Sequence, residues 1–178
     1  MGINLARSSF EQIRIDEMQV INELERNARE SMDEIARNCD FSRQKVWRII
    51  NTLEKNQTIW GYTAIVDDNK IDRKKFVILV KKTIDSITKT FDKTVQLTMQ
   101  NKAKELGINI GYSMYLHGEY DWLFIFSAKD LINAKRFSNI LLSEYPDLIK
   151  EVKLLEGIFQ VQKAGIINPN IDKLKDFL

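Results

Sequence analysis

The stretch that decides the fold of this chain is residues 31–65, SMDEIARNCDFSRQKVWRIINTLEKNQTIWGYTAI. Its start predicts a short helix, because Ser31 can act as an N-cap and Glu34 can reach back to it as a capping box. Asp40 is one of the few non-glycine residue types that tolerate a left-handed backbone, so a sharp turn is expected there. Ser42 then caps a second helix. This order predicts a helix-turn-helix motif.

The second helix is expected to have one buried face and one basic exposed face. Its apolar residues recur at i, i+3, i+4 and i+7, namely Val46, Ile49, Ile50 and Leu53. Residues 42–56 carry four cations against the single carboxylate of Glu54, a net charge of 4 − 1 = +3. Guanidinium and amide groups pair with base edges, whereas lysines and helix N-termini contact phosphates. We expect base or groove contacts from Arg43, Gln44, Trp47 and Arg48, and backbone contacts from Ser42, Lys45, Asn51 and Lys55.

The same helix pair has a simpler interpretation. Capped amphipathic helices with solvated charges occur in many folds, so spacing alone does not establish DNA binding. Trp47 is ambiguous in the same way, because a tryptophan can contact a groove or cover the seam between two helices.

Length and composition predict a globular chain without a metal or cofactor. The 178 residues are 44% apolar, which is enough for one large domain or two small ones. Cys39 and His117 are the only residues of their types, so one chain can build neither a disulfide framework nor a Cys/His zinc site. No apolar run reaches the length of a membrane span and no signal peptide is recognisable, so a cytoplasmic location is expected.

The charge is unevenly distributed along the chain. Residues 1–67 contain 9 Lys+Arg and 11 Asp+Glu, a net −2, while residues 68–178 contain 18 and 14, a net +4. DNA binding would therefore depend on a local patch that dimerisation doubles. An alternative is a sensing or structural module whose N-terminal part has lost DNA binding.

The segments around the motif suggest a three-helix, winged-helix-like head and a hinge. Residues 1–14 have weak periodicity and are expected to form an arm-like, partly helical segment. Asp16 is expected to cap the next helix, with Ile15 and Val20 as a hydrophobic staple. Residues 58–66 are rich in β-forming side chains and predict a strand. A polar hinge is expected at residues 68–75.

The second half of the chain predicts an α+β domain. Residues 76–80 suggest a buried strand, residues 87–106 a helix that ends at Gly107, and residues 108–116 and 122–126 two alternating strands joined by a turn. Asp130 can cap a helix that continues to about Tyr145, and residues 149–161 are again extended. This βαββαβ order predicts a ferredoxin-like sandwich over residues 76–163, followed by a tail at residues 164–178.

One face of such a sheet has no helices and needs cover. Five residues are expected to form an apolar surface for a second subunit: Trp122, Phe124, Phe126, Phe159 and Val161. Alternatively the domain's own core buries them, since alternation allows only about half to face each side. A dimer is expected because a helix-turn-helix protein reads two half-sites with a two-fold pair of motifs.

Residues 15–67 resemble the N-terminal half of the Lrp/AsnC (feast/famine) transcriptional regulators. The Asp-led first helix, the NAR segment, the pattern around SRQKVWRIINTLE and the GYTA before the hinge match nearly in register. The chain departs from that pattern at the turn, where Asp40 replaces the usual glycine. The segment YLHGEYDWLFIFSAKD, residues 115–130, is similar to the effector domain of the same family, so the resemblance covers roughly residues 15–162.

The resemblance implies a homodimer or higher oligomer that binds double-stranded DNA and is modulated by a small molecule, such as an amino acid, bound between subunits. Carried over by position, Gly118, Glu119, Tyr120 and Asp121 would line the effector site. A glycine permits close backbone approach, and a carboxylate can pair with an α-ammonium group. The same two residue types are also what a hairpin turn selects, so a purely structural role is an equal alternative.

An enzyme is the competing hypothesis from a different class. Siroheme decarboxylases resemble the Lrp/AsnC proteins in both domains, and His117, Tyr120 and Trp122 are faintly similar to a His, Tyr and Trp arrangement in those enzymes. A histidine could act there as an acid or as a cation toward a propionate group. The GEYD and GYTA segments follow the regulators instead, so we expect no enzymatic activity.

Overall fold

The computed structural model describes residues 2–83 and 93–177, which form two compact units. The helix-turn-helix unit contains the chain up to Ile65 together with Val161–Ile171. The sheet unit contains Val66–Gln160 and the residues that follow Ile171. Within the described residues, no helix is both long enough and apolar enough to cross a membrane.

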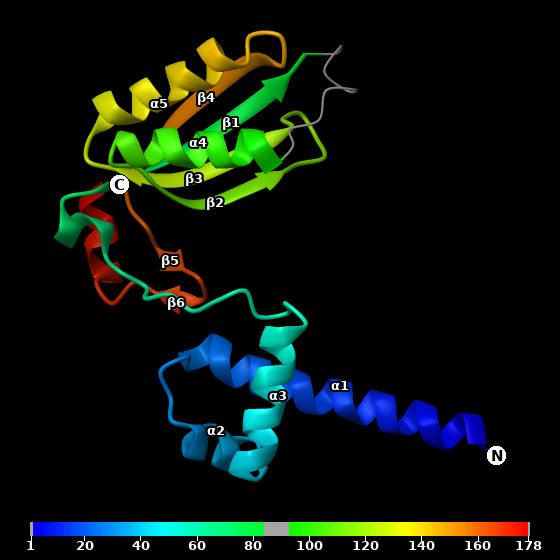
Figure 1. The fold of residues 1–178 in the computed structure, drawn as a ribbon. Coiled ribbons are helices and arrows are strands. Elements are labelled where there is room, and N and C mark those ends of the chain that lie inside the picture. The colour runs from blue at the N-terminus through cyan, green and yellow to red at the C-terminus, as the bar shows by residue number, and fades with distance from the viewer. Residues whose placement is uncertain (1, 84–92, 178) are drawn as a thin grey trace. The chain divides into compact units, whose positions relative to one another are not determined.

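Three helices build the helix-turn-helix unit: α1 (Gly2–Asn27), α2 (Met32–Asn38) and α3 (Arg43–Lys55) (Figure 1). Their core contains six buried residues, Val20, Ile35, Ala36, Cys39, Val46 and Ile50. Burial against apolar neighbours raises the pKa of the Cys39 thiol above its ordinary value, which keeps the sulfur neutral in this core.

The local features predicted for the motif are confirmed. The Ser31 hydroxyl accepts from the Glu34 N–H at 3.2 Å, and the Glu34 carboxylate accepts from the Ser31 N–H, which completes the capping box at the start of α2. Asp40 has φ 56°, in the left-handed region, and reverses the chain between α2 and α3. The Ser42 hydroxyl caps α3 by accepting from the Lys45 N–H at 3.2 Å.

The prediction that Asp16 begins the first helix is wrong. α1 runs without interruption from Gly2 to Asn27, so Asp16 lies in its interior and the expected arm is part of the same helix. The predicted staple is also absent: Val20 is completely buried, whereas Ile15 is 48% exposed. The cap was misplaced because the Asp16 carboxylate has a tertiary partner, described below, that its sequence neighbours do not reveal.

The strand predicted at residues 58–66 is also wrong. None of the strand pairings among the described residues includes this segment, and the Trp60 side chain is 94% exposed. β-Propensity reflects packing on a paired sheet, and no neighbouring strand of the described chain is available here. A short 3₁₀ helix, η1 (Asp68–Ile71), follows in the region predicted as the hinge.

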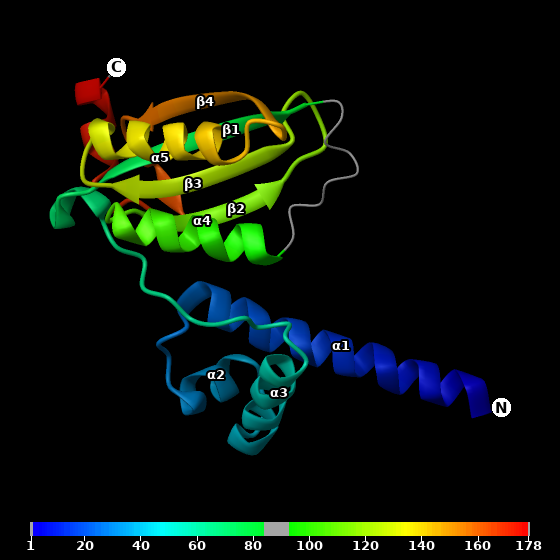
Figure 2. The same ribbon diagram turned by 45° about the horizontal axis from the view of Figure 1, so that its top comes forward.

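The sheet unit has the predicted βαββαβ order. Its elements are β1 (Lys74–Lys82), α4 (Lys93–Glu105), β2 (Asn109–Tyr115), β3 (Trp122–Ala128), α5 (Leu131–Glu144) and β4 (Ile149–Gly157). The sheet order is β2-β3-β1-β4, every pair is antiparallel, and both helices pack on one face, as Figure 2 shows. This is the ferredoxin-like arrangement. The Asp130 cap of α5 is confirmed, while the expected helical residues 87–92 lie outside the described part of the chain.

The alternation along β3 was predicted, but its two faces were assigned the wrong way round. Trp122, Phe124 and Phe126 are at most 1% exposed and form the core beneath α4 and α5. The opposite face, here called the open sheet face, is largely apolar as well, and no helix of the described residues covers it. From the strand registers its apolar residues are Val77, Leu79, Tyr112, Met114, Leu123, Ile125 and Leu155, and Lys153 lies on the same face opposite Leu79.

The C-terminal segment contains a hairpin and a 3₁₀ helix. β5 (Gln162–Lys163) and β6 (Ile166–Ile167) pair across a two-residue turn in which Ala164 and Gly165 both have positive φ. η3 (Ile171–Phe177) follows, and Phe177 lies 5.3 Å from the Phe159 ring. Phe159 is therefore half-buried within the sheet unit, while Val161 is 45% exposed.

Candidate nucleic-acid interface

The packing of α3 determines which of its side chains can meet a partner. Val46, Ile50 and Leu53 are at most 6% exposed, and Ile49 packs partly against the same core. The predicted apolar stripe is therefore confirmed, and the opposite side of the helix faces solvent. The helix begins at Arg43 directly after its Ser42 cap, so its N-terminal turn is open on the exposed side.

The four residues expected to contact bases are all exposed on this side. They are Arg43, Gln44, Trp47 and Arg48. Trp47 is 55% exposed, so it does not fill a seam between helices. The Arg43 guanidinium lies 3.7 Å from an Asp33 carboxylate oxygen, and both side chains are largely exposed. Such an exposed ion pair contributes at most about 1 kcal/mol to stability, so Arg43 can leave Asp33 and pair with another anion.

The residues expected to contact the DNA backbone differ in their exposure and in the contacts that they already make. Lys55 is exposed, whereas Asn51 is half-buried. The Ser42 hydroxyl is occupied as the helix cap. The Lys45 Nζ lies 2.7 Å from the Asp16 carboxylate and 3.5 Å from the centre of the Phe41 ring.

The Lys45–Asp16 contact is a structural link that sequence reasoning missed. The hydrogen bond from Lys45 holds the pKa of the Asp16 carboxyl below its ordinary value, with a smaller contribution from Gln12, and burial opposes the shift. The side chains of Asp16 and Lys45 are 14% and 35% exposed. The pair ties α3 to α1, so Lys45 has an established partner before any DNA is bound.

A second missed contact joins α3 to the segment that follows it. The Tyr62 hydroxyl donates to a Glu54 carboxylate oxygen at 3.0 Å. Burial raises the pKa of Tyr62, and the hydrogen bond to Glu54 raises it further. The eight-residue spacing crosses the end of a helix, so helical periodicity could not reveal the contact.

The candidate effector residues lie in the turn between β2 and β3. Asp121 supports the sheet itself: its carboxylate accepts from the Lys82 N–H at 2.7 Å, and its own N–H donates to the Val80 carbonyl at 2.9 Å. Gly118 has no atom within 4 Å of where a Cβ would stand and does not have positive φ, so the turn does not require a glycine there.

The other two residues of this turn are more accessible. Glu119 is exposed. The ring of the half-buried Tyr120 lies 5.2 Å from the Lys153 Nζ, and the hydrogen bond with Tyr120 raises the pKa of Lys153. The turn therefore has a structural carboxylate at Asp121 and an accessible carboxylate at Glu119.

The residues proposed for the enzyme alternative differ in accessibility. Trp122 is completely buried on the helix-covered face of the sheet, where its indole N–H donates to the Ser113 hydroxyl at 2.9 Å. His117 is exposed in the turn. Among the residues that the structure describes, no group of three or more His, Cys, Asp or Glu side chains could hold a metal ion.

The fold and the exposed face of α3 define a helix-turn-helix module joined to a ferredoxin-like domain. Residues 17–59 match the family model described as winged helix-turn-helix DNA-binding. No curated protein sequence matches the chain closely enough to count as a relative.

Solved structures extend the comparison to most of the chain. An AsnC family transcriptional regulator from Agrobacterium tumefaciens is 15% identical, covers 83% of this chain and 92% of its own, and gives a TM-score of 0.60. LrpC of B. subtilis is 18% identical, covers 83% of this chain and 95% of its own, and gives a TM-score of 0.60. The transcriptional regulator NMB0573 from Neisseria meningitidis was solved as a complex with L-Met. It is 15% identical, covers 87% of this chain and 96% of its own, and gives a TM-score of 0.62. The chain therefore has the two-domain fold of the Lrp/AsnC regulators, as the sequence predicted.

The Asp16–Lys45 pair should contribute to stability at neutral pH. We expect Asp16→Asn to lower the free energy of unfolding at pH 7 by about 0.5–1 kcal/mol, because the substitution removes the ion pair. Since the folded-state pKa of Asp16 is lowered, the native pair is fully stabilising above the unfolded-state pKa of about 4, and its contribution is lost as the pH falls through the folded-state value.

Urea unfolding of the native chain and the variant at pH 7 and under acidic conditions measures both effects. Glu11→Gln, which neutralises an exposed carboxylate of the same helix, is the matched control and should change stability little. If the free energies of unfolding of the native chain and Asp16→Asn differ by the same amount at both pH values, the stabilising role of the Asp16–Lys45 pair is contradicted.

Proposed function

We propose that this protein is a sequence-specific DNA-binding transcriptional regulator of the Lrp/AsnC type. The observation that carries the proposal is the orientation of α3: its apolar face is buried, and Arg43, Gln44, Trp47 and Arg48 face solvent beside a capped N-terminus. The match of residues 17–59 to a winged helix-turn-helix DNA-binding model supports the same conclusion.

The chemistry of this face fits a DNA groove. Arg43 and Arg48 can donate two hydrogen bonds each to guanine, and the Gln44 amide can pair with adenine. Lys55 and Asn51 lie further along α3 and would position the helix on phosphates, with the N–H groups behind Ser42 offering an anion contact. Lys45 contributes indirectly, because its bond to Asp16 holds α3 in place.

A homodimer formed through the open sheet face completes the proposal. Tyr112, Met114 and Leu155 are 43–51% exposed on this face, which α4 and α5 leave uncovered. Two sheets can pack face to face about 10 Å apart, and a two-fold dimer supplies the pair of motifs that two half-sites require.

The turn between β2 and β3 is the proposed effector site. Gly118, Glu119, Tyr120 and Asp121 would surround a small molecule such as an amino acid, with Glu119 as the accessible partner for its ammonium group. The neisserial neighbour of the same fold was solved with L-Met, which supports a search among amino acids.

We predict that Arg48→Ala weakens specific binding to the operator by about 1–3 kcal/mol, because it removes a bidentate base contact. The operator is first identified by capture of bound genomic DNA, and affinity is then measured by fluorescence anisotropy at a fixed salt concentration. Arg136→Ala on α5 removes the same charge from the exposed surface of the other unit and should leave affinity unchanged. An unaltered affinity of Arg48→Ala would remove Arg48 from the reading surface.

We predict that Leu155→Glu converts the dimer to a monomer, since it would place two buried carboxylates between the packed sheets. Size-exclusion chromatography with light scattering measures the mass. Ile132→Glu is the control, because Ile132 is 63% exposed on α5, away from the open sheet face. If Leu155→Glu stays dimeric, the subunits associate elsewhere.

We predict that at least one of the twenty amino acids changes operator affinity by about fivefold or more, a typical coupling between two sites. Glu119→Gln should abolish this response, while Glu105→Gln, at an exposed carboxylate of α4, should preserve it. A response that survives Glu119→Gln would move the effector site away from this turn, and the absence of any response would refute amino-acid modulation.

A further inference from the structure

The N-terminal part of α1 extends beyond the DNA-binding module. The matched module begins at residue 17, whereas the helix begins at Gly2. Residues 2–14 are here called the arm. In Figure 1 the arm projects away from α2 and α3 within its unit. An isolated helix of this length is marginally stable in water, so its persistence needs a packing partner.

The described part of the arm carries large apolar side chains that the unit does not cover. Phe10 is 70% exposed and Ile13 is 52% exposed. Ile13 lies seven residues before Val20, which is completely buried in the core. The face of α1 that packs on the unit therefore continues into the arm, where no other element of the unit covers it.

The spacing of these residues is that of a helix-pairing seam. Phe10 and Ile13 occupy positions a and d of a seven-residue repeat, and the sequence continues the same repeat upstream at Ile3 and Ala6. Glu17 occupies the next a position and ends the apolar seam where the DNA-binding module begins. This pattern indicates pairing with another helix of the same repeat.

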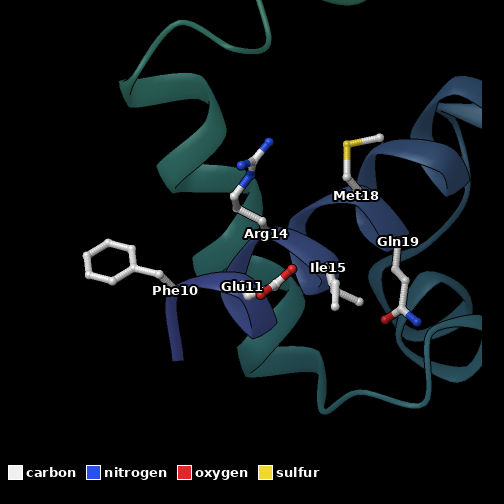
Figure 3. A pocket seen from close by; sticks show the side chains of 6 residues that line it. All are labelled: Phe10, Glu11, Arg14, Ile15, Met18 and Gln19. Carbon is white, nitrogen blue, oxygen red and sulfur yellow. The ribbon is translucent and has the colours of Figure 1, made fainter. Parts of the chain in front are cut away.

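A neighbouring face of α1 is less suited to pairing. Figure 3 shows a hollow beside the helix lined by Phe10, Glu11, Arg14, Ile15, Met18 and Gln19. Two of these side chains are charged, and the apolar ones do not follow a seven-residue spacing. This face offers a comparison surface, because Met18 is as exposed as Ile13, at 52%.

The charge of the arm argues against nucleic acid or a membrane as its partner. The arm contains Arg7 and Arg14 against Glu11, a net +1. DNA-binding arms and membrane-surface helices are typically rich in Lys and Arg. A neutral apolar seam fits a second copy of itself, which every oligomer of this chain supplies.

We propose that the arms of two copies pair in parallel as a short coiled coil. A parallel pair opposes Phe10 to Phe10 and Ile13 to Ile13, so that each level of the seam buries matching apolar side chains. The two-fold axis then holds both DNA-binding modules at the same end of the paired arms.

The pairing rests on the dimer of the proposed function. A seam of about two heptads is marginal by itself, so it gains from the high effective concentration that an existing dimer interface supplies. The like charges of two Glu17 residues would oppose continuation of the seam, so the arms separate there.

Cysteine cross-linking in the full-length chain tests this arrangement. Ile13→Cys places two thiols across the seam within the Cα separation of about 4.4–6.8 Å that a disulfide requires. Under mild oxidation with copper phenanthroline, a covalent dimer should become the main species on a non-reducing gel. Gln12→Cys lies on the far side of the seam and should remain at the level of the native chain, whose single Cys39 is buried.

The outcomes separate this proposal from the dimer on which it rests. Light scattering of the same samples reports whether the unoxidised chain is dimeric. A dimer that forms no Ile13 cross-link, or that cross-links equally at Gln12, would overturn the arm pairing alone. A monomeric chain would overturn both proposals.

A second pair of variants tests the seam without cysteines. Ile13→Glu should raise the dissociation constant of the dimer at least about fivefold, because two carboxylates would face each other across the seam. Sedimentation equilibrium measures this constant. Met18→Glu introduces the same charge at an equally exposed position and should stay within about twofold of the native value. Equal effects of the two substitutions would overturn the assignment of the contact to the seam.

Discussion

The burial of one face of α3 is the constraint on which the rest of the structure depends. Val46, Ile50 and Leu53 are nearly inaccessible to water, and each such side chain contributes roughly 1.5–3 kcal/mol relative to an exposed one. A rotation of the helix would forfeit this energy and bury Arg48. The apolar contacts within the unit thus decide which polar groups face outward, and the proposed DNA contact depends on that orientation more than on net charge.

In the sheet unit, burial of apolar side chains likewise fixes the orientation of each strand, here at every second residue. Along β3, Trp122, Phe124 and Phe126 are buried under the two helices, while Leu123 and Ile125 point to the open sheet face. Both sets are apolar, so both faces of the strand have to be covered. One is covered by the chain's own helices, and the other supports the proposed subunit interface.

The candidate site was predictable where its causes are local. The Ser31–Glu34 box, the left-handed Asp40 and the Ser42 cap each depend on residues within a few positions of one another, and all three were predicted. The role of Asp16 was not, because its partner Lys45 is distant in sequence and becomes a neighbour only after α1 packs on α3. At the effector turn, the sequence left Asp121 open between a ligand contact and a structural role, and the structure shows its bond to the Lys82 N–H.

The sequence by itself determined the order of the elements, the turn at Asp40 and the apolar face of α3, because propensity, capping and periodicity act over a few residues. Only the tertiary structure decided which face of β3 lies beneath the helices, that Lys45 is held by Asp16, and that Val161–Ile171 returns to the helix-turn-helix unit. These features depend on contacts between segments far apart in the chain, and such contacts leave no periodic signal in the sequence.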